Sequence, residues 1–310
     1  MYIPRNLTKT VLFIVSAVIL LFAAPASAAV NPVSGETALL DSYHRNSVRL
    51  MTSSFGIPLY LESFEKGDRV HVDVYGIFNN RFSTVANVLK IPANWCDIVS
   101  LHPNVKACTY GGQPGAGLLT FYIGSKNYQS PENARQVVYH YRHVAQTTRY
   151  LDILLNAEEG PFGTNNHKMR FEALPLDGGK TFVHVSYEYS DSAAIRLAGK
   201  AYFATLGKGK AGFTVTGTDK NGKPVYVGGP RGALERNAVR YYFAIQSFLS
   251  PLRYQETKRF SMRISQWYDL TSRYKKQLIE QNKKEYIASK TIEHKNQLML
   301  QSRIALTPSP

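Results

Sequence analysis

Alternating hydrophobic and polar residues dominate the middle of the chain and predict an antiparallel sheet. Two such runs, Leu59–Phe64 and Arg69–Phe78, flank Lys66-Gly67-Asp68, which has the composition of a hairpin turn. In each run the apolar side chains fall on every second position, so one face of the sheet is buried and the other is solvated. The later predicted strands are Lys106–Tyr110, Leu118–Gly124, Arg135–His143, Arg149–Asn156, His167–Leu174 and Lys180–Tyr189.

Apolar residues spaced three or four apart predict helices before, between and after these strands. The broadest apolar stripe lies on Ala233–Leu249, and Gly207–Gly229 before it predicts a hairpin with its tip at Asp219-Lys220-Asn221-Gly222. A second long helix is expected from Phe260 to Ser289. The remaining predicted helices are Thr37–Met51, Phe82–Leu89, Ala93–Leu101 and Ala193–Leu206.

The beginning of the chain has the composition of a secretory signal peptide. Arg5 and Lys9 precede an uncharged run from Val11 to Ala24, and Ala26-Ser27-Ala28 provides small residues for cleavage. The uncharged run of about 14 residues is short for a membrane span, which leaves an uncleaved anchor as the alternative. We therefore expect a periplasmic or secreted protein that is cut near Ala28.

Charge and cysteine content change this picture in two respects. The chain has 37 Lys+Arg against 22 Asp+Glu, a net charge of +15, which calls for an anionic partner or surface. In an exported protein that partner is not expected to be nucleic acid. Export also favours a disulfide between Cys96 and Cys108, with two buried free thiols as the alternative.

The order of elements resembles the helix-grip fold of the START and Bet v 1-like superfamily. There, a curved antiparallel sheet wraps a long C-terminal helix, an α+β architecture. The resemblance covers about residues 59–250. It is carried by the strand pair around Lys66-Gly67-Asp68 and by the short helix pair that contains Trp95. The sequence His102-Pro103-Asn104-Val105, which leads into a strand, and the helix Ala233–Leu249 also contribute to it. The expected organisation is a signal peptide (1–28), an N-terminal arm (29–58), the helix-grip domain (59–250) and a basic helical extension (251–310).

The resemblance implies a cavity between sheet and helix that holds a hydrophobic small molecule or lipid, and some members of the superfamily are cyclases or hydrolases. The residues agree with a ligand of this class, because aromatic walls with a few hydroxyls suit an amphipathic molecule. The alternative is that these side chains simply pack against one another. The candidate ligand-binding residues are Tyr139, Tyr141, Phe171, Tyr187, Tyr189, Tyr241, Tyr242 and Ile245.

The sequence contains no GxSxG, HExxH or P-loop motif, and neither a metal nor another cofactor is expected. The glycine-rich segment Gly111–Gly117 lacks the Lys-Ser/Thr pair that a phosphate-binding loop needs and is expected to connect two strands. His143, with a nearby tyrosine, is a candidate for acid–base catalysis. His140 and His143 have opposite strand parity, so they cannot share one site without a bulge.

The C-terminal extension concentrates positive charge. Residues 251–310 contain 12 Lys/Arg against 5 Asp/Glu, and Lys275, Lys276, Lys283 and Lys284 are candidate contacts with an anionic membrane surface. The alternative is a solvated helix that docks on the domain through a narrow apolar stripe. Three functions follow: a carrier of a hydrophobic ligand without catalysis, an enzyme on the same fold, or an envelope interaction protein that acts through its basic helix.

Overall fold

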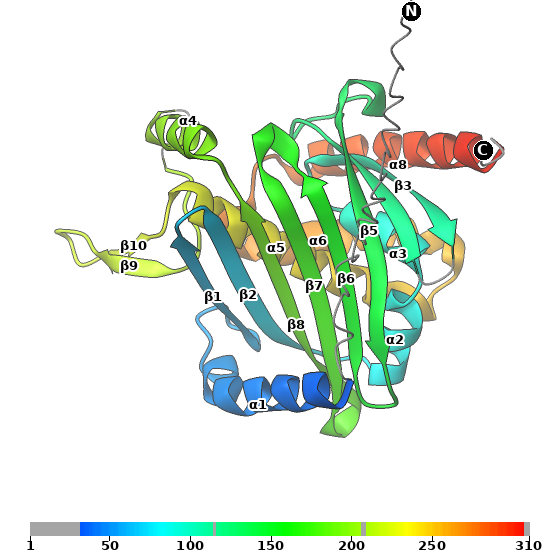
Figure 1. Ribbon diagram of the computed structural model, residues 1–310, viewed down its shortest axis with the longest axis horizontal. Helices are drawn as coiled ribbons and strands as arrows, with labels where there is room; N and C mark the ends of the chain where they lie inside the picture. Colours follow the sequence, from blue (N-terminus) through cyan, green and yellow to red (C-terminus); the bar gives the residue numbers. More distant parts are fainter. Residues whose placement is uncertain (1–31, 114–115, 206–208, 307–310) are drawn as a thin grey trace, which may run out of the picture.

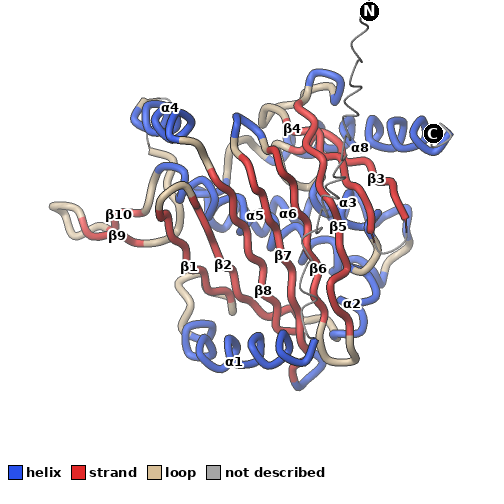
Figure 2. The backbone as a smooth tube through the Cα atoms, viewed as in Figure 1, coloured by secondary structure: helices blue, strands red, loops and turns tan. Residues whose placement is uncertain are grey.

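The protein is described by a computed structural model that covers residues 32–113, 116–205 and 209–306. The predicted signal peptide lies outside these residues. Eight strands form one antiparallel sheet in the order β1-β2-β8-β7-β6-β5-β4-β3 (Figures 1 and 2). They are β1 (Leu59–Lys66), β2 (Arg69–Phe78), β3 (Val105–Gln113), β4 (Ala116–Ile123), β5 (Arg135–Gln146), β6 (Leu151–Glu159), β7 (Asn165–Leu176) and β8 (Lys180–Ser190).

The inner face of the sheet packs on three helices: α2 (Phe82–Leu89), α3 (Pro92–Val99) and the long α5 (Gly229–Leu249). The alternation expected along β2 is present, because Val70, Val72 and Val74 are buried in this core. α5 crosses the sheet closely at Gly76, where an added Cβ would overlap the hydroxyl of Tyr242. A glycine at this position therefore lets the helix approach the strand.

The sheet thus wraps the long helix α5, and the predicted helix-grip architecture is confirmed. Pairing extends β3 and β4 into the glycine-rich segment, with Gly112 opposite Gly117 and Gln113 opposite Ala116.

The outer face of the sheet carries a second, smaller core. Helix α1 (Pro32–Met51) crosses one end of this face, where Leu39 and Leu50 pack with Tyr75, Tyr150 and Phe182 (Figure 1). The helix begins five residues earlier than the segment Thr37–Met51 expected from the sequence.

The insertion before α5 forms a helix and a hairpin that project from the sheet (Figure 1). They are α4 (Ala193–Ala204) and the two strands β9 (Val215–Thr218) and β10 (Pro224–Tyr226). The fully buried Glu235 of α5 holds the base of the hairpin, because it accepts hydrogen bonds from the backbone N–H groups of Phe213 (2.6 Å) and Thr214 (3.0 Å). The hairpin expected within Gly207–Gly229 is therefore present and tied to the gripped helix.

The prediction of a single helix over Phe260–Ser289 is wrong. The chain forms α6 (Glu256–Thr271), one turn α7 (Lys275–Leu278) and α8 (Lys283–Leu306). The break lies at Ile279, which has an extended backbone, and Asn282 then caps α8 by accepting a hydrogen bond from the Glu285 N–H at 3.0 Å. The return hydrogen bond from the Asn282 N–H to Glu285 completes a capping box, a local signal that starts a new helix here.

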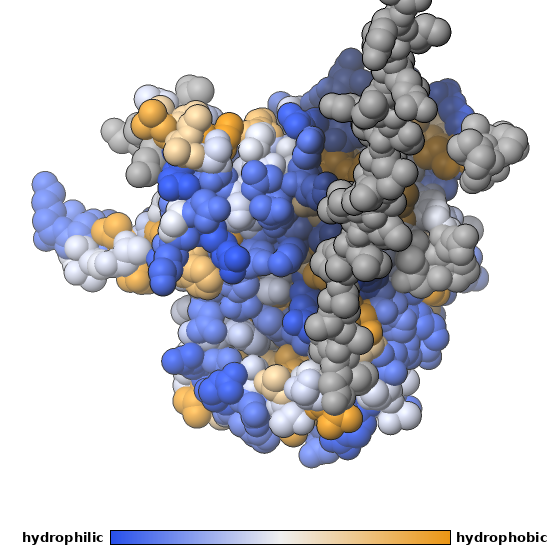
Figure 3. All heavy atoms as spheres, viewed as in Figure 1, coloured by the Kyte–Doolittle hydropathy of each residue, from blue (hydrophilic) through white to orange (hydrophobic). Residues whose placement is uncertain are grey.

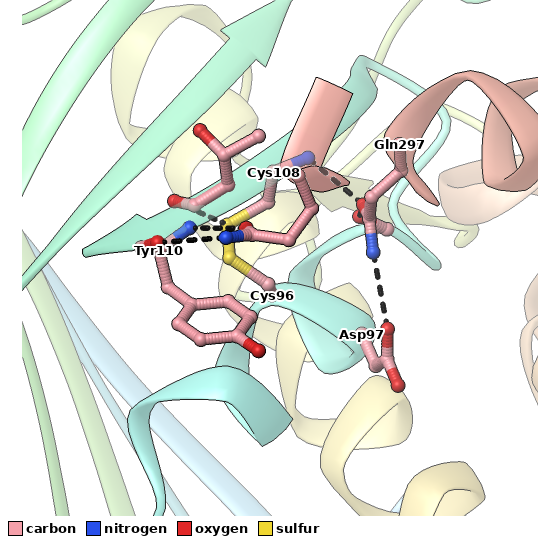
Figure 4. Close-up of a disulfide and its surroundings, with 8 residues drawn as sticks. Cys96, Asp97, Cys108, Tyr110 and Gln297 are labelled. Carbon is pink, nitrogen blue, oxygen red and sulfur yellow. Dashed lines mark hydrogen bonds between the residues drawn. A yellow bond between two sulfur atoms is a disulfide. The ribbon is translucent and has the colours of Figure 1, made fainter. Parts of the chain in front are cut away.

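α8 covers the exposed edge of the sheet at β3. Gln297 accepts a hydrogen bond from the Cys108 N–H at 2.8 Å, and Gln301 both accepts from the Tyr110 N–H (2.8 Å) and donates to its carbonyl (3.0 Å) (Figure 4). Edge strands otherwise present unpaired backbone groups to other chains. Side-chain amides of α8 thus satisfy backbone groups of β3 that a further strand would otherwise pair with.

Buried charges also fix α8 on the domain. Lys106 of β3 donates to Glu293 of α8 at 2.8 Å, and Lys290 contacts the other oxygen of that carboxylate at the same distance. Both lysines also donate to backbone carbonyls, including Pro103 and Val105, so their buried ammonium groups are hydrogen-bonded inside the protein. The basic extension is therefore a docked part of the fold along α8.

The expected disulfide between Cys96 and Cys108 is present and joins α3 to β3 (Figure 4). Its Cα atoms are 4.9 Å apart, within the range that disulfides span. Among the described helices, none combines the length and apolar character that crossing a bilayer requires.

Candidate functional site

The predicted ligand-binding residues gather in the layer between the sheet and α5. Tyr139, Tyr141, Phe171 and Tyr187 face inward from the strands, and Tyr241 and Ile245 face them from α5. Tyr242, which follows Tyr241 on α5, lies against Gly76 and Phe78 of β2. Tyr189 is half-buried at the rim, where its ring stacks on His167.

The space between these side chains is closed. The residual cavity is about 10 Å³, which is at the lower limit for a single water molecule. The side chains around it are Trp95, Ile98, Val99, Leu155, Met169, Phe171, Val185, Tyr241 and Ile245, together with Arg170. A ligand bound here would have to displace side chains, and the unbranched Met169 is the most adaptable of them.

A chain of hydrogen bonds enters this apolar layer from the β6–β7 turn. Thr164 donates its hydroxyl hydrogen to the Pro161 carbonyl at 2.6 Å, so its oxygen accepts from Nε2 of His167 at 2.8 Å. Nδ1 of His167 then accepts from the Tyr187 hydroxyl at 3.1 Å. The hydroxyl of Tyr139 lies next in this layer, close enough to Tyr187 for each to influence the pKa of the other.

The direction of this chain leaves an acceptor at its inner end. Because the Tyr187 hydroxyl donates to His167, it faces Tyr139 as an acceptor, and the oxygen of Tyr139 keeps lone pairs for another donor. Burial lowers the pKa of His167 to about 4 and raises the pKa of Tyr187 to about 12. Burial also raises the pKa of Tyr139 well above its ordinary value. All three groups are therefore uncharged at neutral pH.

His167 is absent from the residues predicted to line the site, although its strand parity could have identified it. It shares the inward parity of Met169 and Phe171 on β7 and is only 2% exposed. A histidine on the apolar face of a strand must find hydrogen-bond partners inside the protein. This requirement, together with the strand parity, could have indicated that His167 belongs to a buried polar group in the site.

The two histidines of β5 take separate places. His140 is exposed on the outer face, and His143, closer to the end of the strand, is half-buried beside Lys90. Burial lowers the pKa of His143, and its Nε2 is buried without a hydrogen-bond partner. The nearby Tyr141 directs its hydroxyl to the Leu89 carbonyl at 3.2 Å. The acid–base pairing with a tyrosine that we expected for His143 is not formed here.

A second polar cluster lies on the outer face of the sheet. His184 sits between two carboxylates, with Nε2 2.8 Å from Asp73 and Nδ1 2.9 Å from Glu172. His71 also contacts Asp73 at 2.8 Å. Arg170 makes a bidentate ion pair with the fully buried Asp152. The ring nitrogens of His184 are both engaged, so this residue is held as a charged link between strands. Within the described ranges, no His, Cys, Asp and Glu side chains form a group of three or more that could bind a metal.

The lysines expected at a membrane surface differ in their surroundings. Lys275, Lys276 and Lys284 are exposed, whereas Lys283 forms an ion pair with Asp269 at 2.6 Å. Lys276 also lies over the ring of Tyr226 in the projecting hairpin, 4.8 Å from its centroid. The exposed charge of α7 is thus next to the hairpin.

No model of a known protein family matches the chain, and no curated protein matches its sequence. Solved structures similar to it include human StAR-related lipid transfer protein 5, with 10% identity over 71% of this chain and 99% of that chain and a TM-score of 0.36. A START superfamily protein from Mycobacterium smegmatis shares 15% identity over 44% of this chain and 92% of its own, with a TM-score of 0.29. The Zhui aromatase/cyclase from Streptomyces sp. R1128 shares 12% identity over 40% and 70%, also with a TM-score of 0.29. These scores are low, and the helix-grip architecture stands on the strand order and α5 of this chain.

Proposed function

We propose that the protein is an exported binding or carrier protein for a mostly apolar small molecule or lipid, which it holds between the sheet and α5 without catalysis. The observation that carries the proposal is the hydrogen-bonded chain from Thr164 through His167 to Tyr187, which ends beside Tyr139. A core built only for packing gains nothing from buried hydroxyls, because each costs desolvation. Ligand sites, by contrast, combine apolar walls with a few convergent polar groups.

The direction of that chain indicates the chemistry of the ligand. The free acceptor on Tyr139 matches an uncharged hydrogen-bond donor, such as the hydroxyl of a fatty alcohol or sterol. The neutral state of His167, Tyr187 and Tyr139 offers no charge for a carboxylate or phosphate head group. Entry requires the closed interior to open, and Met169 and Ile245 line the residual space that would widen.

Export is supported by the predicted signal segment 1–28 and by the Cys96–Cys108 disulfide, since structural disulfides persist in oxidising compartments.

Displacement of the neutral apolar dye Nile red tests the binding function. We expect saturable binding of the dye, displacement by 1-dodecanol, and about fivefold weaker displacement by dodecyl methyl ether, which lacks the donor, because one hydrogen bond contributes about 1 kcal/mol. In Tyr139→Phe the alcohol and the ether should compete equally, whereas the matched variant Tyr60→Phe on the outer face should keep the difference. Absence of saturable dye binding would overturn the proposal.

A further inference from the structure

Helix α4 turns its apolar face away from the protein. Ala194, Leu197, Ala198 and Ala201 recur at helical spacing and are all exposed, and Leu197 is 71% exposed. The opposite side lies toward the domain, where Gly199 approaches Pro230 at the start of α5 and Ile195 is half-buried. A surface helix normally buries its apolar stripe, so this inverted arrangement requires an apolar environment outside the protein.

Phe162 continues the apolar surface beside α4. It lies in the turn between β6 and β7, is 83% exposed and adopts a left-handed backbone with φ of 60°. Bulky residues rarely adopt this conformation, and such strain concentrates at functional positions. The adjacent Gly163 packs against Ile195 of α4, so the turn and the helix form one surface.

The β9–β10 hairpin supplies positive charge at the same end of α5. Lys220 and Lys223 are exposed near its tip, and the exposed Lys276 of α7 lies over the ring of Tyr226 in β10. Asp219, the acidic residue of the tip, is engaged in the turn, where it accepts from the N–H groups of Asn221 and Lys223 at 2.8 and 2.9 Å. Buried Glu235 fixes the base of the hairpin, so the lysines project on a supported arm.

We propose that α4, Phe162 and the β9–β10 hairpin form a docking surface for an anionic phospholipid bilayer. Leu197 and Phe162 would enter the interfacial region, and Lys220, Lys223 and Lys276 would contact the head groups. An exposed apolar helix face combined with nearby lysines is the pattern of a peripheral membrane-binding surface. Figure 3 shows the apolar residues gathered on α4 and the neighbouring strand ends, apart from the hydrophilic outer face of the sheet.

Two acidic residues limit how the surface can meet the membrane. Glu158 and Glu159 are exposed at the end of β6, close in sequence to Phe162. They oppose anionic lipid on that side, so the hairpin lysines carry the electrostatic attraction while α4 and Phe162 supply the apolar contact. The proposal is independent of ligand binding, because it concerns the free protein on a ligand-free vesicle.

Vesicle cosedimentation tests the surface. The mature chain, beginning at residue 29, is mixed with phosphatidylcholine vesicles with and without phosphatidylglycerol. We expect association with the anionic vesicles, reduced at least tenfold in Leu197→Glu and in Phe162→Glu, and about thirtyfold or more in the double variant Lys220→Glu/Lys223→Glu, which loses about 1 kcal/mol for each lysine. Circular dichroism and urea unfolding confirm that each variant is folded.

Matched variants on α8 separate this surface from the basic C-terminal helix. Leu298 is 54% exposed, and Lys284 and Lys295 are exposed on the same helix. Leu298→Glu and Lys284→Glu/Lys295→Glu should retain association. The proposal is overturned if the protein does not bind anionic vesicles, if Leu197→Glu binds as well as the parent, or if the α8 variants lose binding equally. A dimer in solution that Leu197→Glu dissociates, without vesicle binding, would also overturn it in favour of a second copy of the chain.

Discussion

The side-chain oxygen of Gln297 accepts a hydrogen bond from the backbone N–H of Cys108 at 2.8 Å, across 189 positions of sequence. The same glutamine accepts from Ser100 and donates to Asp97, so it links α8 to α3 and to the edge strand β3 at once.

Removing this amide should destabilise the protein. Gln297→Ala leaves a buried backbone N–H without a partner, and we expect the free energy of unfolding to fall by about 1–3 kcal/mol. Urea unfolding measures the change, and Gln136→Ala, at an exposed position of β5, is the control. A loss no greater than that of the control would show that the edge contact contributes nothing.

A side chain at position 76 should separate α5 from β2. In Gly76→Ala the new Cβ overlaps Tyr242, and overpacking of this kind costs about 1–3 kcal/mol. Gly111→Ala is the matched control, because a Cβ there meets no atom within 4 Å. Thermal unfolding should show recovery when Gly76→Ala is combined with Tyr242→Leu and little recovery with Tyr242→Phe, whose ring keeps the overlap. Additive losses in both double variants would contradict the close approach.

His184 should make stability depend on pH. Burial alone would lower the pKa of His184, but hydrogen bonds with Asp73 and Glu172 outweigh it and raise the pKa to about 9. Its stabilisation is therefore complete below about pH 6.5, the pKa of an unfolded histidine, and is lost as the pH rises toward 9. Between pH 6.5 and 8 the free energy of unfolding should fall by about 2 kcal/mol.

The pH window and the control variant isolate this effect. His71, whose raised pKa acts in the same direction, contributes to the slope, whereas Lys290, whose pKa burial lowers to about 8, opposes it above pH 8. Urea unfolding at intervals from pH 6.5 to 8 should show a shallower slope in His184→Gln and an unchanged slope in His140→Gln. If the free energy of unfolding depends equally on pH in the parent and in His184→Gln, His184 does not form a charged link between the strands.

The disulfide should contribute about 3 kcal/mol, because it closes a short loop of the unfolded chain. Cys96→Ala/Cys108→Ala should lower the melting temperature, and dithiothreitol should lower the melting temperature of the parent but leave that of the double variant unchanged. A parent protein insensitive to reduction would mean that the bridge is absent or energetically neutral.

Much of the architecture could be predicted from the sequence because it depends on local signals. Strand alternation located all eight strands of the sheet, and the predicted helix Phe82–Leu89 has the bounds that the structure shows. The path after residue 271 depends on partners far away, since Lys290 and Gln297 find theirs on β3. The capping sequence Asn282-Lys283-Lys284-Glu285 was nevertheless a readable start for a new helix.

The interior of the site was harder to predict. Strand parity correctly placed Tyr139, Tyr141 and Phe171 on one face, but the volume left between them depends on how closely α5 approaches. Gly76 decides that distance on one side, and its role is visible only when Tyr242 is seen against it. Parity identifies which residues share a layer, whereas packing decides whether that layer is hollow.

The long sequence separation between α8 and β3 has a consequence for biogenesis. A polypeptide emerges from the ribosome or from a translocation channel starting at its N-terminus, so Cys108 of β3 emerges 189 positions before Gln297 arrives. A chain interrupted before Gln297 would carry an open strand edge able to pair with another copy. The last helix therefore protects the newly made protein from self-association, and shortened products are expected to be cleared or to aggregate.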